Sequence, residues 1–149
     1  MPRLFGAMRD WLRSSSSERP PSAQLAVFGK HPGWNDHIDD IGLRTEELIT
    51  VRRTLYSGGI ASNIESGYWE RLPSDQRVDA FGHSLLWQLD NSIVYGRLWP
   101  SSDGKGRMKY PMVACIQFEG VTPMDAERVG RPLLERLGSE CLATDSAQA

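Results

Sequence analysis

A chain of 149 residues, 40% of them hydrophobic, is long enough for one domain with a sizeable buried core. The formal net charge of −2 argues against general nucleic-acid binding, which needs a basic surface, and no apolar run approaches the roughly 20 residues of a membrane-spanning helix. Cys115 lies in an apolar run and Cys141 in a polar tail, so we expect no disulfide framework and a reducing cytoplasm.

Residues 1–24 are expected to form an amphipathic helix followed by a Ser/Pro linker. The apolar side chains that share one helical face are Leu4, Phe5, Met8, Trp11 and Leu12. Arginines occupy the other faces, and no continuous apolar stretch follows them as it would in a secretory signal. Two interpretations remain open. Residues 3–13 contact an anionic membrane surface or a partner's groove, or they pack on their own domain or fray.

The domain is expected to start at residue 25 with a short strand, 25–28, that ends at Gly29. The loop after it contains side chains of the types that ligate metals: His31, Asp36, His37, Asp39 and Asp40. Their spacing fits no standard site, so we expect the carboxylates to cap turns and the protein to bind no metal and no cofactor.

The next elements alternate between helical and strand patterns. A helix is predicted over 43–57, with Thr45 as its N-cap and Gly58-Gly59 as its end, and a weaker helical piece over 61–72. Strands over 85–89 and 93–99 flank a tight-turn sequence, and the apolar run 112–118 predicts a strand that is buried on both faces.

A last helix is predicted to begin at Thr122-Pro123, to break at Pro132 and to end at Gly138. Residues 139–149 are then a flexible tail. Together the elements predict a single α+β domain over 25–138, in which helices cover a mainly antiparallel sheet.

Motifs for catalysis are absent from the sequence. It contains no nucleophile elbow, Walker motif or dinucleotide fingerprint, and its Gly-Lys-Gly-Arg loop leads through Pro111 into a strand instead of a helix N-terminus. We therefore expect a protein that is not an enzyme. The alternative is a small-molecule or phosphate-binding domain. In its hydrolytic form, Ser101 or Ser102 is the nucleophile and His83 is the base.

Two separated motifs resemble the TagF (ImpM) family of type VI secretion-associated proteins. The matching residues are Phe28, Gly29, Lys30, Pro32 and Asp36 in the first motif, and Gly96, Leu98, Pro100, Ser101, Asp103, Gly106, Arg107 and Pro111 in the second. The resemblance implies a cytoplasmic, non-enzymatic regulator of secretion assembly. It also implies contact with a forkhead-associated-domain scaffold protein. Peripheral contact with the inner membrane is an expectation that rests on residues 3–13 alone.

The shared pattern has two physical interpretations. In the architectural one, the glycines adopt unusual backbone angles, and Asp36 or Asp103 accepts a hydrogen bond from Arg107. In the functional one, a basic rim docks an acidic partner; its candidate residues are Lys30, Arg97, Lys105, Arg107 and Lys109.

Overall fold

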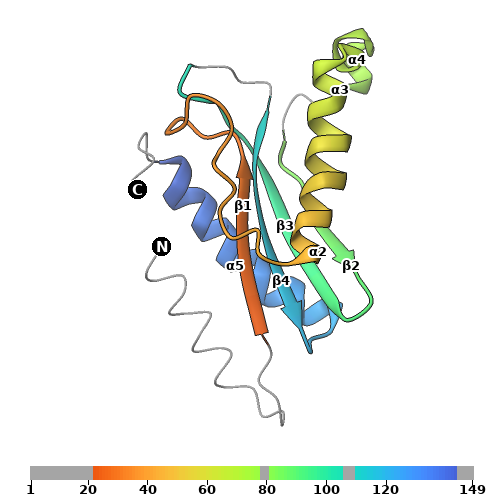
Figure 1. Cartoon of the computed structure of the whole chain (residues 1–149), viewed down its shortest axis with the longest axis vertical. Coiled ribbons are helices and arrows are strands. Elements are labelled where there is room, and N and C mark those ends of the chain that lie inside the picture. Colours follow the sequence, from red (N-terminus) through yellow and green to blue (C-terminus); the bar gives the residue numbers. More distant parts are fainter. Residues whose placement is uncertain (1–21, 78–80, 106–109, 144–149) are drawn as a thin grey trace.

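The computed structural model describes residues 22–77, 81–105 and 110–143, which form a four-stranded antiparallel sheet with helices on both faces (Figure 1). The strands are β1 (Ser22–Gly29), β2 (Ser84–Gln88), β3 (Ser92–Pro100) and β4 (Pro111–Glu119), in the spatial order β1-β4-β3-β2. The helical segments are α2 (Glu46–Val51), the π-helical η1 (Arg52–Ala61), α3 (Ser62–Glu65), α4 (Tyr68–Arg71), the 3₁₀ turn η2 (Ser74–Gln76) and α5 (Pro123–Leu142). The predicted α+β fold with an antiparallel sheet is confirmed.

β4 forms the centre of the domain because both of its faces are buried, as its apolar run predicted. Ile116 and Phe118 point into the layer beneath α5, whereas Val113 and Cys115 point into the layer beneath α2, η1 and α3. Burial raises the pKa of the Cys115 thiol to about 12, so this cysteine is a core residue and not a nucleophile at neutral pH.

The first helical layer begins where it was predicted and ends later. The Leu48 amide donates to the Thr45 side chain at 3.2 Å, which confirms Thr45 as the N-cap. Gly58-Gly59 do not end the helix: the chain stays helical through η1 and α3, and the turn into α4 occurs at Gly67, with φ of 71°. Ile60 and Ile64 extend the buried apolar face beyond the glycines, so packing outweighs their low helix propensity.

The extent of α5 also differs from the sequence prediction. Its start at Thr122 is confirmed by the 3.1 Å hydrogen bond from the Asp125 amide to the Thr122 hydroxyl. The helix then continues through Pro132 and Gly138 to Leu142, so residues 139–142 are helical and not part of a tail. Pro132 is on the solvent side, where water can satisfy the carbonyl that its ring leaves without a partner.

The N-terminal boundary of the domain also differs from the prediction. β1 begins at Ser22, three residues before the expected boundary, because Ser22 pairs with Glu119 and Ala23 with Phe118. The predicted helix over 3–13 and the tail residues 144–149 lie outside the described residues.

Gly138 provides a test of the packing between α5 and the sheet. A Cβ at this position would lie 2.3 Å from the Trp99 ring, so we expect Gly138→Ala to lower the free energy of unfolding by about 1–3 kcal/mol. Gly58→Ala is the matched control, since its Cβ would be 3.4 Å from the nearest atom, and it is expected to gain up to about 1 kcal/mol. Urea melts of both variants check this; equal responses would contradict the close approach of α5 to Trp99.

Candidate functional site

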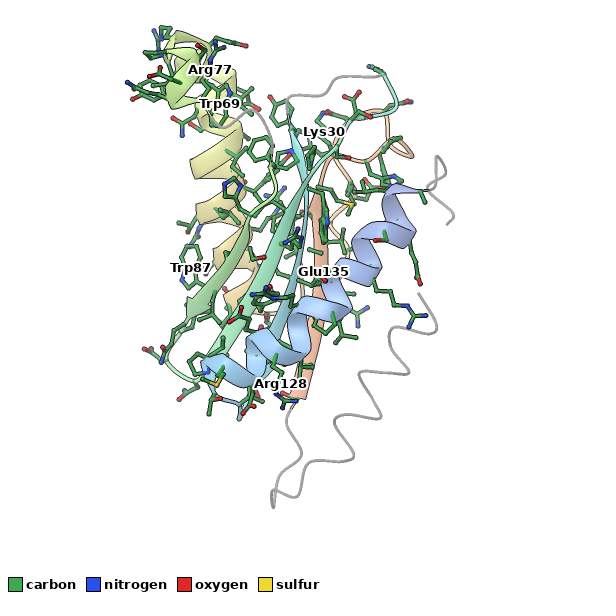
Figure 2. All side chains as sticks on the ribbon, turned by 180° about the vertical axis from the view of Figure 1, so that it is seen from behind. Lys30, Trp69, Arg77, Trp87, Arg128 and Glu135 are labelled. Atoms are coloured by element: carbon green, nitrogen blue, oxygen red, sulfur yellow. The ribbon has the colours of Figure 1, made fainter. Side chains whose placement is uncertain are left out.

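The candidate site lies at the end of the sheet where β1 finishes and β4 begins (Figure 2). Gly29 has φ of 101°, which turns the chain out of β1, and a Cβ there would lie 2.3 Å from the Pro111 carbonyl oxygen. The same carbonyl accepts the Lys30 amide at 3.0 Å, and the Gly29 carbonyl accepts the Ile38 amide at 2.7 Å. These contacts direct the Lys30 side chain inward.

The Lys30 ammonium forms a buried ion pair that joins the two sequence motifs. Its Nζ lies 2.6 Å from Asp36 Oδ1 and 3.2 Å from Asp103 Oδ2. The exposed fraction of the side chain is 2% for Lys30, 0% for Asp103 and 75% for Asp36. Asp103 thus supplies the buried countercharge that an interior ammonium needs, and Asp36 closes the pair on the solvent side. The hydrogen bond from Lys30 also lowers the pKa of Asp36, which keeps that carboxyl ionised.

Aromatic rings surround the ion pair. Lys30 Nζ lies 5.0 Å from the centre of the Tyr110 ring, in a cation–π contact. His37 makes edge contacts with Tyr110 and Tyr56, at ring distances of 5.3 and 5.6 Å. Among the described residues, the buried Tyr56 hydroxyl has no hydrogen-bond partner, and burial raises its pKa, so it stays protonated. The rings exclude water from the ammonium and strengthen its pairing.

The start of the loop after β3 packs onto the loop after β1. Gly104 donates its amide to the Trp34 carbonyl at 2.5 Å, and Asp103 Oδ1 accepts the Lys105 amide at 3.0 Å. A Cβ at Gly104 would lie 3.1 Å from the carbonyl oxygens of Pro32 and Trp34, so a larger residue here would require these neighbours to shift. In the described part of the loop, the amides of Gly104 and Lys105 thus bond to protein acceptors and are not directed at a phosphate.

His31 attaches the same loop to the end of α5. Its Nδ1 accepts the Gly33 amide at 2.9 Å, which places the ring proton on Nε2, and Nε2 donates to the Cys141 carbonyl at 2.7 Å. The ring also contacts Trp34 edge-on at 5.5 Å. His31 is therefore a structural residue with both nitrogens engaged, and Trp34 packs against the core as a plug.

The expected basic rim changes in composition. Lys30 is not part of it, because its charge is buried and paired; the sequence could not show that two aspartates would meet it. Lys105 is exposed, and Arg97 is half-buried with one guanidinium nitrogen 3.1 Å from the Ser84 hydroxyl. Arg107 and Lys109 lie outside the described residues, and so does the proposed contact of Arg107 with Asp36 or Asp103.

Most of the other motif residues have architectural places. Phe28 and Leu98 are in the core, Ser101 is buried, and Pro100 lies opposite Pro111 at the end of the β3–β4 ladder. A Cβ at Gly96 would lie 2.9 Å from the Cys115 sulfur. The Pro32 carbonyl faces Gly104, whereas Gly106 is outside the described residues.

Sequence reasoning missed the aromatic part of the site. Tyr110 precedes Pro111 at a strand end and Tyr56 lies in the middle of a helix, so their meeting with His37 depends on tertiary structure. A weak signal existed: Tyr56 continues the apolar face of Leu48 and Val51, one turn beyond Arg52.

Neither a metal site nor a known relative adds a function to this geometry. Within the described ranges, no group of three or more His, Cys, Asp or Glu residues is placed to hold a metal ion, and both cysteines are free thiols. The described helices include none with the length and hydrophobicity of a membrane-spanning segment. No model of a known protein family matches the chain, and no curated protein is significantly similar to it.

Proposed function

We propose that the protein is a non-enzymatic regulatory or accessory module of a type VI secretion system, which controls assembly post-translationally through protein–protein contact. The proposal starts from the sequence resemblance to the TagF (ImpM) family. One observation carries it further: Lys30 of the first motif and Asp103 of the second, 73 positions apart, form one buried ion pair. The two motifs are thus parts of one structural unit, which supports a single shared role for them.

The proposed partner is a cytoplasmic forkhead-associated-domain scaffold protein, and the proposed docking surface is the loop that starts at Ser101. Asp103 anchors this loop through Lys30, and the exposed Lys105 follows directly. A loop that is fixed at its base and charged beyond it suits recognition, because its side chains can change without disturbing the sheet. The contact needs no catalytic group.

Charge reversal in this loop tests the docking surface. The double variant Lys105→Glu/Lys109→Glu should keep its melting temperature, since Lys105 is exposed and solvated lysines contribute little to stability. Its association with the scaffold protein should slow roughly 10-fold at low salt and become less salt-dependent, because rim charges act mainly on encounter. Binding titrations at several salt concentrations, with melting curves, measure both.

The matched control is Arg53→Glu/Arg71→Glu, which changes the net charge equally at exposed positions of η1 and α4. It should bind as the unmodified chain does. If the lysine variant also binds normally at low salt, the basic-rim hypothesis is wrong and the docking face lies on the helices. If the scaffold protein neither binds nor co-purifies from the native cell, the proposed partner itself is wrong.

A further inference from the structure

Among the described elements, no helix lies over one corner of the sheet. α5 is the described helix on this face, and it lies mainly over β3. The outer strand axes of a four-stranded sheet are about 14 Å apart, whereas a helix with its side chains is about 10 Å wide. Figure 2 shows α5 crossing the sheet obliquely, so that the start of β1 lies beside it and not beneath it.

The side chains at this corner are apolar. Ala23 and Leu25 of β1 point to the α5 side and are half-buried, whereas Val27, farther along the strand, is buried in the same core as Ile38 of the following loop. Val121, before α5, and Leu133, on it, are also half-buried and pack against this same core. We call Ala23, Leu25, Val121 and Leu133 the apolar corner.

The sequence supplies a suitable occupant. Residues 3–13 have the pattern of an amphipathic helix with five apolar side chains on one face. A helix of this length is about 16 Å long, and the eight residues 14–21 can span up to about 26 Å. The linker joins β1 at Ser22, next to the apolar corner, so the helix can fold back along β1.

We infer that residues 3–13 form a helix that docks on the apolar corner of the same chain and completes the second helical layer. The short linker gives the segment an effective concentration in the millimolar range, which favours this site over a separate groove of equal affinity. In this arrangement the arginines of the docked helix face solvent, and its apolar face, which includes Trp11, is buried against the sheet and cannot contact lipid. This inference does not depend on the proposed function or its partner.

A double-mutant cycle on the full-length chain tests the contact. Trp11→Ala should lower the melting temperature by about 4 °C through lost apolar burial, although alanine favours the helix. Combined with Leu133→Ala, it should lower the temperature by clearly less than the sum of the single effects, because each variant removes the same contact.

Two controls separate docking from other effects. Asp10→Ala, on the opposite face of the predicted helix, should leave the melting temperature unchanged. Leu86→Ala, whose residue is 43% exposed on β2 at the far edge of the same sheet face, should add fully to Trp11→Ala. An additive result for Trp11 with Leu133, or no effect of Trp11→Ala, overturns the inference.

The membrane alternative is decided by sedimentation with vesicles of phosphatidylcholine and phosphatidylglycerol. The full-length chain should stay in the supernatant, because the apolar face of the helix is covered. If it sediments, and Trp11→Ala abolishes sedimentation without changing the melting temperature, the helix faces lipid and the docked arrangement is wrong.

Discussion

Replacing Lys30 by Met is expected to lower the free energy of unfolding by about 3–5 kcal/mol, because it leaves the Asp103 carboxylate buried without its ammonium partner. Asp103 has a side-chain exposure of 0%, so water cannot take over the role of Lys30. Urea denaturation at neutral pH measures the loss.

Two further variants identify the cause of that loss. Lys105→Met removes an exposed lysine from the loop that contains Asp103 and should change stability by less than about 0.5 kcal/mol. Lys30→Met/Asp103→Leu should recover much of the stability, because a buried ion pair can often be exchanged for apolar packing. A loss below about 1 kcal/mol for Lys30→Met alone would mean that the pair does not hold the two loops together.

Gly29→Ala is expected to destabilise the protein by roughly 2–5 kcal/mol, which combines a left-handed backbone conformation with overpacking. The new Cβ would lie 2.3 Å from the Pro111 carbonyl oxygen, and backbone on both sides must move to relieve that overlap. The Pro111 carbonyl also accepts the Lys30 amide, so the ion pair shifts with it.

Gly67→Ala is the control for the backbone contribution alone. Gly67 has φ of 71°, and its nearest neighbour would be a flexible Glu70 oxygen at 3.8 Å, so about 1–2 kcal/mol is expected. Thermal melts of both variants, with circular dichroism to monitor the sheet, compare the two losses. Similar losses would show that Gly29 is needed for its backbone angle and not for the close approach to β4.

Local signals predicted the sheet well. The turn sequence before Ser92 and the apolar run of β4 depend on neighbouring residues, and both strands occur where those signals place them. Local signals failed where tertiary packing decides. Gly138 resembles a helix end in sequence, but in the structure it provides the space that the Trp99 ring fills.

The candidate site was predictable in position but not in role. The motifs predicted that the end of β1 and the loop after β3 matter, and the structure brings Lys30 and Asp103 together there. Lysine is rarely buried, so the sequence favoured a surface role for Lys30. Only the fold shows that two aspartates and Tyr110 surround its ammonium.

The strand order β1-β4-β3-β2 has a consequence for synthesis on the ribosome. β1 is made first among the strands, but its ladder partner β4 is made last, and Ser22 pairs with Glu119. At 5–20 residues per second, β1 waits roughly 5–20 s before β4 exists. During this time Ala26 and Phe28, both buried in the finished domain, remain open to solvent, to chaperones or to another nascent chain. The sheet therefore closes only after β4 has left the ribosome.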